Sequence, residues 1–345
     1  MPGSLPWKRG FRIGPSRAKL PPNEETDMIR RRAILAAPAL LPGLASAQPA
    51  WPQRPVRVIV PYASGGGTDI LARAIGDAMR PHMSQPIVIE NRAGASGVIG
   101  SEVVVRSEPD GHTLMAVVSA HVMNKHVLPS LPFDPVRDVS PVAMLTRSTM
   151  VLAASHSLPF NDIRGLAAFA RANPTRLSTG STESLSQFIG QEMARRIGAE
   201  IPDVQYRAGS QLMTDIVAGH LPLGWTSSAS AMPFMAGGRA KIIAVSTATR
   251  TPFFPDVPTM QEQGIPDFDL PGWVALLGPA GIPAPIMARI GGLLRTAYDD
   301  PALRARFTSM GIEPDLRAPP ATLAAMQRED ALWAAAAAAG RLTKA

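Results

Sequence analysis

The sequence contains no cysteine among its 345 residues. This absence excludes disulfide bonds, thiolate catalysis, iron–sulfur clusters and zinc sites built on cysteine. It leaves the compartment open, because exported proteins can also lack cysteine. The sequence also lacks any run of about eighteen unbroken apolar residues, so it offers no candidate for a transmembrane helix.

Motifs for catalysis and for nucleotide binding are missing as well. The segment Gly94–Val98 lacks the last glycine of a G-x-S-x-G nucleophile elbow. The six histidines form no H-x-x-x-H pair. Neither the phosphate-binding G-x-x-x-x-G-K-S/T nor the dinucleotide-binding G-x-G-x-x-G occurs. The sequence therefore predicts a protein that uses no metal and no cofactor and is not an enzyme.

Positive charge is concentrated at the N-terminus. The formal net charge is +7, from 34 Lys and Arg against 27 Asp and Glu. Residues 1–47 hold eight of the basic residues and three of the acidic ones, which leaves 26 and 24 in residues 48–345. A body of nearly balanced charge has no general attraction for phosphate backbones, so we expect no nucleic-acid partner.

Residues 28–47 have the three zones of a secretory signal peptide. Arg30–Arg32 supply the positive zone, Ala33–Leu44 the apolar stretch, and Ala45–Ala47 the small-residue cleavage signal. The apolar stretch is too short to span a bilayer, which takes about 20 residues. We therefore predict export to the periplasm and cleavage after Ala47, by the general or the twin-arginine route. Residues 1–27 are predicted to be a disordered extension that results from a start-site error.

The body has enough apolar residues for a large core, since 46% of the chain is hydrophobic. Short runs of strand type alternate with segments of helical periodicity. Strands are expected at 55–61, 87–89, 113–118, 151–154, 177–179, 204–206, 223–225 and 242–245, and helices at 70–79, 98–106, 163–172, 185–197, 211–218, 284–298, 301–310 and 320–339. This alternation predicts an α/β fold built from βαβ units with parallel strands.

Two polar loops that precede helices are candidate binding sites. The first, Ser64–Gly67, lies between a predicted strand and a predicted helix that Thr68 or Asp69 is placed to cap. Free amide groups and the helix dipole at such a position attract a carboxylate or a phosphate. The second loop, residues 180–186, adds serine and threonine hydroxyl groups. A tight turn in the first loop and helix capping in the second are the alternatives that the sequence leaves open.

Six motifs, taken in order, resemble one known family. They are Arg57–Asp69 (RVIVPYASGGGTD), Val88–Gly100 (VIENRAGASGVIG), Pro109–Leu114 (PDGHTL), Tyr206–Ser210 (YRAGS), Phe254–Thr259 (FPDVPT) and Leu277–Gly281 (LGPAG). By their order and spacing, the chain from about Trp51 to its C-terminus resembles the Bug-type solute receptors. These are the extracytoplasmic substrate-binding proteins of tripartite tricarboxylate transporters.

The resemblance implies a two-lobed periplasmic-binding-protein fold with a type II-like topology. Each lobe is expected to have a mainly parallel sheet flanked by helices, with the ligand cleft between the lobes. Lobe 1 is expected to comprise 48–148 plus 272–345, and lobe 2 to comprise 149–271. The hinge is expected near 146–150 and 270–274, where the chain crosses between the lobes.

The resemblance also implies which residues bind the ligand. In the family, a loop after the first strand and a matching loop of the second lobe hold a carboxylate, largely through main-chain N–H groups. In this sequence the first loop corresponds to Tyr62, Ala63, Ser64, Gly66, Gly67, Thr68 and Asp69. The second loop, within 180–187, contributes Ser181, Thr182, Ser184 and Ser186, while Ser119, Ala120, Tyr206 and Thr226 line the cleft.

Three positions depart from the family pattern. Phe188 stands about where the family commonly has a histidine, and Glu183 adds a negative charge to the second loop. Thr226 stands where an aspartate is common. A carboxylate near a bound carboxylate is unfavourable unless it faces away or meets a cationic group. These departures favour a bulkier or more apolar carboxylate, or an amino acid, over a small dicarboxylate.

The expected function is that of an extracytoplasmic receptor, and we expect a monomer. It would capture a small carboxylate (a di- or tricarboxylate, an aromatic acid or an amino acid) and present it to the membrane permease subunits of a tripartite tricarboxylate transporter. A hydrolase or isomerase that uses Asp69 with a serine of the cleft is one alternative. A ligand-sensing input protein for a signalling kinase is another.

Overall fold

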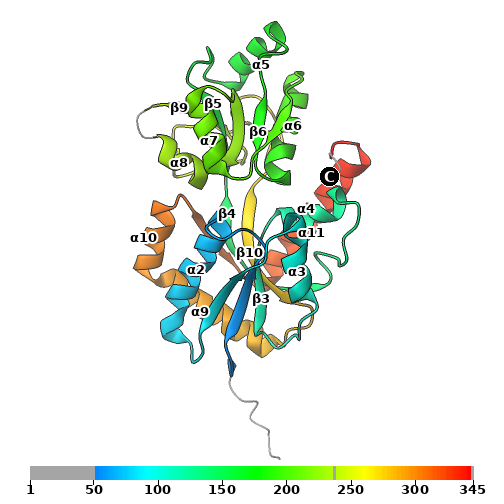
Figure 1. The fold of residues 1–345 in the computed structure, drawn as a ribbon, viewed down its shortest axis with the longest axis vertical. Helices are drawn as coiled ribbons and strands as arrows, with labels where there is room; N and C mark the ends of the chain where they lie inside the picture. The colour runs from blue at the N-terminus through cyan, green and yellow to red at the C-terminus, as the bar shows by residue number, and fades with distance from the viewer. Residues whose placement is uncertain (1–50, 236–237, 343–345) are drawn as a thin grey trace, which may run out of the picture. The chain divides into compact units, whose positions relative to one another are not determined.

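The computed structural model describes residues 51–235 and 238–342. The predicted extension, signal peptide and cleavage site lie outside the described residues. The described chain forms two mixed β-sheets flanked by helices (Figure 1). We call the part with the larger sheet lobe 1 and the part with the smaller sheet lobe 2. In the described ranges, no helix combines the length and the apolar character that crossing a membrane requires.

The sheet of lobe 1 has six strands. They are β1 (Val56–Val60), β2 (Ile87–Asn91), β3 (Thr113–Val118), β4 (Val139–Ser148), β10 (Gly272–Pro279) and β11 (Glu313–Arg317). Their order across the sheet is β11-β4-β10-β3-β1-β2. In the parallel part, Val58 of β1 lies opposite Ile89 of β2 on one side and Leu114 of β3 on the other. The carboxyl ends of these three strands therefore meet at one edge of the sheet.

Helices cover both faces of this sheet. They are α2 (Gly67–Met79), α3 (Val98–Val105), α4 (Ala120–Val127), α9 (Ala284–Asp299), α10 (Pro301–Ser309) and α11 (Pro319–Ala338). Figure 1 shows α2, α9 and α10 on one side and α3, α4 and α11 on the other. Successive side chains of a strand point to opposite faces, so β1 divides its residues between two cores. Val58 packs in the core under α2 and α9, while Ile59 packs in the core under α3 and α4.

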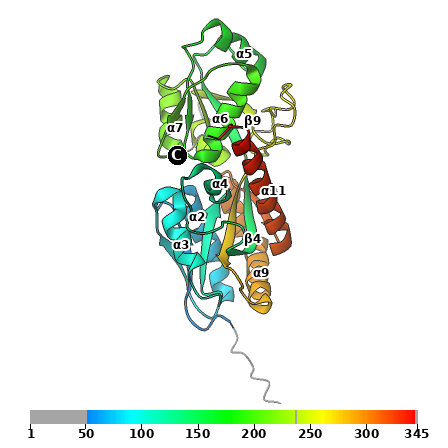
Figure 2. The ribbon, with the colours of Figure 1, turned by 90° about the vertical axis from the view of Figure 1, so that its right-hand side faces the viewer.

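The sheet of lobe 2 has five strands. They are β5 (Met150–Ser155), β6 (Thr179–Ser181), β7 (Asp203–Gln205), β8 (Leu223–Ser227) and β9 (Ala240–Val245), in the order β7-β6-β8-β5-β9. The helices are α5 (Ile163–Ala172), α6 (Ser184–Ile197), α7 (Gly209–Ala218) and α8 (Ser228–Met235). The core under α5 and α6 is continuous with the core of lobe 1, and Phe188 of α6 meets Trp333 of α11 edge-on at 5.0 Å. Figure 2 shows α11 lying beside β4.

The chain crosses between the sheets twice. β4 of lobe 1 is followed by β5 of lobe 2 with one intervening residue, Thr149, and the segment between β9 and β10 returns to lobe 1. The returning strand β10 runs antiparallel to both β3 and β4. Both sheets are therefore mixed, because β10 in lobe 1 and β5 in lobe 2 run antiparallel to their neighbours beside the predicted parallel strands. Parallel neighbours need a crossover connection such as a helix within the same lobe. A strand that enters the sheet from the other lobe has no such connection, and here it runs antiparallel to its neighbours.

Several strands and helices of the structure were not expected from the sequence. The structure adds β4, β10 and β11, together with the helices α4 and α8. β4 contains Pro141, and α8 contains Pro233, so local propensity argues against both elements. Pairing with β10 stabilises β4 instead, and packing against β5 stabilises α8. The predicted lobe boundaries stay a prediction.

Candidate functional site

The loop between β1 and α2 is shaped by one glycine and one carboxylate. Gly65 has φ +78°, in the left-handed region, and its amide donates to Asp69 Oδ2 at 2.8 Å. Arg73, one turn further along α2, forms an ion pair with Asp69 at 3.0 Å. The helix begins at Gly67 with Gly66 as N-cap, and no side chain caps it. The prediction that Thr68 or Asp69 caps this helix is therefore wrong, since both lie within its first turn.

Asp69 is fully engaged in holding this loop. Its side chain is buried, which disfavours the charged form, but hydrogen bonds from Arg73, the Gly65 amide and Asn91 outweigh burial and lower its pKa. A carboxylate with these partners is not available as a general base. By contrast, Ala63 and Ser64 are exposed, as are the three glycines that follow them. The amides of the first helical turn have no side-chain acceptor, which is the arrangement that attracts an anion.

The loop after β2 supports the first loop, and sequence reasoning did not place it in the site. Asn91 Nδ2 donates to the main-chain oxygen of Tyr62 at 3.2 Å. The turn Gly94–Gly97 has positive φ at all four positions, and Asn124 of α4 donates to the Ser96 oxygen at 2.9 Å. The signal for this loop was present, because parallel neighbours such as β1 and β2 end at the same edge of a sheet.

Tyr62 connects the first loop to the end of β3. Its hydroxyl accepts a hydrogen bond from the Val118 amide at 3.2 Å. Its ring lies so close to Gly97 that a Cβ there would stand 3.2 Å from it. The predicted residues Ser119 and Ala120 follow Val118 directly and are buried at the start of α4. The structure thus brings Tyr62, Ser119 and Ala120 together at one edge of the lobe 1 sheet.

The second predicted loop is shorter than expected, because β6 extends to Ser181 and α6 begins at Ser184. Ser181 is buried and its hydroxyl donates to Asp203 Oδ2 at 2.8 Å. The Ser186 hydroxyl accepts from the amides of Thr182 and Glu183 at 3.0 and 3.2 Å. These two hydroxyl groups are used within the protein. The side chains of Thr182 and Ser184 are half-buried and stay candidates for ligand contact.

Tyr206 directly follows β7, and Thr226 lies near the end of β8. These two strands flank β6 in the lobe 2 sheet. The Tyr206 amide donates to the Ser181 oxygen at 2.8 Å, so Tyr206 adjoins the second loop. Its hydroxyl donates to Asp215 Oδ2 at 2.8 Å, and burial together with this carboxylate raises the pKa of Tyr206 to about 12. Thr226 is buried in β8, where a Cβ on Gly209 would stand 2.7 Å from its hydroxyl oxygen. Glycine at 209 therefore lets α7 begin close to β8.

The carboxyl group of Glu183 in the second loop acts electrostatically on Tyr62 in the first loop. Burial raises the pKa of Tyr62, and the carboxyl group of Glu183 raises it further. That the two loops hold a ligand between them, and that the residues named from the sequence bind it, stay predictions.

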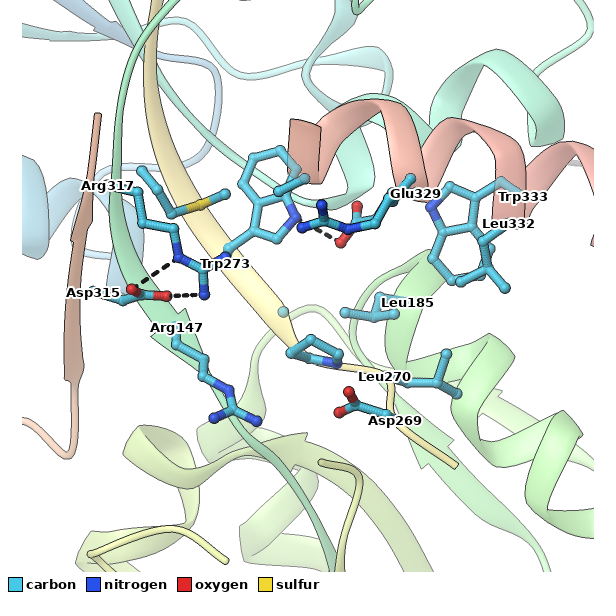
Figure 3. Close-up of a pocket in the computed structure, with 15 residues that line it drawn as sticks. Arg147, Leu185, Asp269, Leu270, Trp273, Asp315, Arg317, Glu329, Leu332 and Trp333 are labelled. Carbon is cyan, nitrogen blue, oxygen red and sulfur yellow. Dashed lines mark hydrogen bonds and ion pairs between the residues drawn. The ribbon is translucent and has the colours of Figure 1, made fainter. Parts of the chain in front are cut away.

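A pocket of about 330 Å³ lies beside the crossing strands (Figure 3). Its walls come from β4, β10, β11 and α11 of lobe 1, from Leu185 of α6 and from the segment 269–271. Arg147 and Arg317 line it, and Arg317 pairs with Asp315. The strand order places β4 and β11 on the opposite side of β10 from β3, β1 and β2. The pocket therefore lies on the other side of β10 from the first predicted loop, and it borders the second one at Leu185.

One half-buried carboxyl group lining this pocket has a raised pKa. Glu329 Oε1 accepts a hydrogen bond from the Trp273 indole nitrogen at 2.6 Å. Burial raises the pKa of Glu329 to about 8, although the hydrogen bond from Trp273 opposes the shift. At neutral pH Glu329 is therefore largely uncharged, which suits its place between apolar side chains of α11 and β10.

Two mixed α/β sheets joined by two crossings form the two-lobed fold of a periplasmic binding protein. Comparison with known families gives the same answer. The family model described as tripartite tricarboxylate transporter family receptor matches residues 71–329, and the chain belongs to this family. The family predicted from the sequence motifs and the two-lobed fold are thereby confirmed.

Relatives and solved structures agree with this assignment. A UPF0065 protein of Agrobacterium vitis is 31% identical over 82% of this chain and 82% of its own length. An R. palustris protein solved with adipate has a TM-score of 0.77 at 28% identity and covers 86% of this chain and 100% of its own. MatC of Rhodopseudomonas palustris, solved with bound malate, has a TM-score of 0.74 at 30% identity, with coverage of 83% and 100%.

Proposed function

We propose that this receptor binds a small carboxylate reversibly between its two facing loops and chemically leaves it unchanged. The observation that carries the proposal is the exposed Ala63–Gly67 loop at the uncapped start of α2. A helix start of this kind is a ready site for an anion. The adipate and malate in the two solved relatives support a carboxylate as the ligand.

The absence of turnover is part of the proposal. A hydrolase or isomerase would need a free base, and Asp69 is held by Gly65 and Arg73. The hydroxyl groups of Ser181 and Ser186 are likewise occupied. Glu183 of the second loop accepts the Ser186 amide in the capping box of α6, and the other groups of the two loops are hydroxyl and main-chain groups that bind and orient.

The wider role that we propose follows from the family. Receptors of this family belong to tripartite tricarboxylate transporters. We infer that the chain is exported, cleaved after Ala47, and acts as a monomer that delivers its ligand to membrane permease subunits. Peptide sequencing of the periplasmic protein should find a new N-terminus at Gln48, and a start before Met28 would contradict this processing.

A thermal-shift screen followed by calorimetry tests the binding function. We expect one or more carboxylates from a panel of dicarboxylates, tricarboxylates, aromatic acids and amino acids to raise the melting temperature, because a ligand that binds only the folded state stabilises it. The ligand recovered from the complex should be chemically unchanged after prolonged incubation. A panel without any stabilising carboxylate, or a converted ligand, would contradict the proposal.

A further inference from the structure

The pocket of Figure 3 has the size of a small-molecule site. Its volume of about 330 Å³ falls within the roughly 300–1,000 Å³ that ligand pockets span. The proposed carboxylate site at the start of α2 does not extend to it, because the pocket lies on the other side of β10 from the first loop. The groups that line the pocket indicate what it would hold.

Part of the pocket wall is apolar. Pro271 lines it from the returning segment and Leu332 from α11, and Leu332 is one of the large apolar side chains that are exposed in the described chain. Trp273 lines it from β10, and its indole nitrogen already donates to Glu329 Oε1 at 2.6 Å. The other carboxyl oxygen of Glu329 and the indole nitrogen of Trp333 are buried. These residues therefore offer a ligand mainly aromatic and aliphatic surface.

Arg147 brings a positive charge that has no anionic partner. It is half-buried on β4, and its Nη1 donates to the hydroxyl oxygen of Thr249 at 3.3 Å. Within residues 51–235 and 238–342 Arg147 takes part in no ion pair, and Figure 3 shows no bond between it and Asp269. Asp269 Oδ1 accepts from the Ala248 amide at 2.9 Å instead. Most of the five N–H donors of Arg147 are therefore available to a carboxylate.

A neighbouring arginine is neutralised by the chain itself. Arg317 of β11 lines the same pocket, and its Nε donates to Asp315 Oδ1 at 2.9 Å. A second hydrogen bond, from Nη2 to Asp315 Oδ2, completes a two-pronged pair. Arg317 is thus compensated from within its own strand, whereas Arg147 is not.

The lining of the pocket is positively charged at neutral pH. Glu329 adds little negative charge there, because burial raises its pKa to about 8. A positive wall beside an apolar wall is complementary to an anion that has an apolar body. The other charged residues of the lining are three arginines and two aspartates: Arg147, Arg317, Arg328, Asp269 and Asp315.

We propose that this pocket is a second ligand site and that it takes a small aromatic carboxylate. The guanidinium group of Arg147 binds the carboxylate through charge-assisted hydrogen bonds. Trp273, Pro271 and Leu332 cover the aromatic ring. No residue of the first loop lines the pocket, so one receptor molecule can hold a ligand at each of the two sites.

Matched compounds test the two halves of the site. Calorimetry at pH 7 should use phenylacetate, 3-phenylpropionate and 4-phenylbutyrate as probes. We expect at least one of them to bind the wild-type protein at least tenfold more tightly than its own carboxamide, which has no charge, and than acetate, propionate or butyrate, which have no ring. Failure of all three acids to bind, or equal binding of each acid and its amide, would overturn the proposal.

Two substitutions show whether the probe lies in the pocket. Arg147→Gln removes the charge and should weaken binding tenfold or more, whereas Arg295→Gln, an exposed change on α9, should keep wild-type affinity. Ala325→Phe fills the pocket and should abolish binding, whereas Ala324→Phe, outside the pocket on the same helix, should not. Urea denaturation identifies the folded variants, and either pocket variant is sufficient. Wild-type affinity in a folded pocket variant would show that the probe binds elsewhere.

Gly65→Ala distinguishes the pocket from the proposed carboxylate site. A probe bound in the pocket should keep its affinity in this variant, whereas a probe bound at the start of α2 should lose about tenfold. Binding that is weakened by Gly65→Ala and kept in Arg147→Gln would overturn the second site and support the first. Binding that survives Gly65→Ala but not Arg147→Gln supports the pocket, whichever ligand the first site prefers.

Discussion

At the residue scale, Gly65 gives the first loop its shape. Its φ of +78° lies in a region that costs residues with a Cβ about 1–2 kcal/mol. The conformation directs its amide to Asp69, and it sets the position of the exposed amides that follow. Among the glycines of this loop, Gly65 is the one with positive φ, whereas the sequence-based site contained only Gly66 and Gly67.

Gly65→Ala should lower affinity for the carboxylate ligand about tenfold and stability by about 1 kcal/mol, because the loop must move to relieve the strain. Gly198→Ala is the matched control. Gly198 has φ +67° at the C-terminal end of α6, and a Cβ at this position would have no atom within 4 Å. It should lose similar stability and keep wild-type affinity by calorimetry. Equal affinity in both variants would contradict a role for the loop geometry.

Glu183 should make the protein less stable as the pH rises. Its pKa is about 7 in the folded protein and near its ordinary value of 4.5 when unfolded. Between these values the folded state binds more protons, so the free energy of unfolding falls with rising pH, and the full cost is present above pH 7. Because Glu183 is partly exposed, we expect a cost on the order of 1–2 kcal/mol.

Urea denaturation of wild type and Glu183→Gln at pH 4.5 and pH 8 measures this cost. The two proteins should have similar stability at pH 4.5, and the variant should be the more stable at pH 8. The comparison cancels the titration of the other groups that both proteins share. A difference in stability that does not change with pH would show that the ionisation of Glu183 is unaffected by folding.

At the element scale, the start of α6 fixes the second loop. The Ser186 hydroxyl accepts from the amides of the two residues before the helix and donates to the main-chain oxygen of Glu183 at 2.9 Å. These bonds hold Thr182–Ser184 against the helix. The cap is therefore a structural element that also determines where the half-buried side chains of the loop lie.

Ser186→Ala should lower the free energy of unfolding by about 1 kcal/mol, the usual cost of losing a cap. It should also weaken ligand binding several-fold, because the second loop loses its anchor. Asp162→Ala is the control, since Asp162 caps α5 through the Gly165 amide at 2.6 Å and lies outside both loops. Denaturation and calorimetry should show both variants destabilised but only Ser186→Ala impaired in binding.

At the scale of the whole molecule, two crossings and the contacts beside them control how the lobes approach. Thr149 and Thr251 both donate to Glu313 Oε1, at 2.8 and 2.7 Å, which connects the crossing and the segment after β9 to β11. The pocket of Figure 3 lies on this side of β10, with walls from both lobes. Because the pocket has walls from both lobes, rotation about the crossings should change its width, and we expect closure of the binding loops to widen it.

Filling the pocket should therefore favour closure. In Ala325→Phe, a bulky side chain on α11 occupies the pocket and resists the approach of its walls during opening. We expect affinity for the ligand to rise several-fold, mainly through slower dissociation, although the changed residue touches no ligand. Ala324→Phe, on the same helix but outside the pocket, should leave affinity unchanged. Weaker binding in a folded Ala325→Phe would contradict this mechanism.

Local pattern was sufficient for much of the fold. The strand at Thr113–Val118 and the helix at Ile163–Ala172 have the predicted bounds, because their apolar periodicity and flanking breakers agree. Local pattern was not sufficient to predict β4, because its partner strand β10 lies more than 120 residues away in the sequence. The predicted parallel strands placed the end of β2 beside the end of β1, but that the Asn91 side chain bonds to Tyr62 depends on tertiary packing.

The sequence by itself determined the alternation of strands and helices, the glycine-rich loop at the start of α2 and the family, because these depend on residues close together in the chain. The tertiary structure decided the antiparallel crossings, the hydrogen bond from Asn91 to the first loop, and the contact of Phe188 with Trp333. Each of these joins residues from different elements, and burial and charge compensation act on neighbours in space regardless of their distance along the chain.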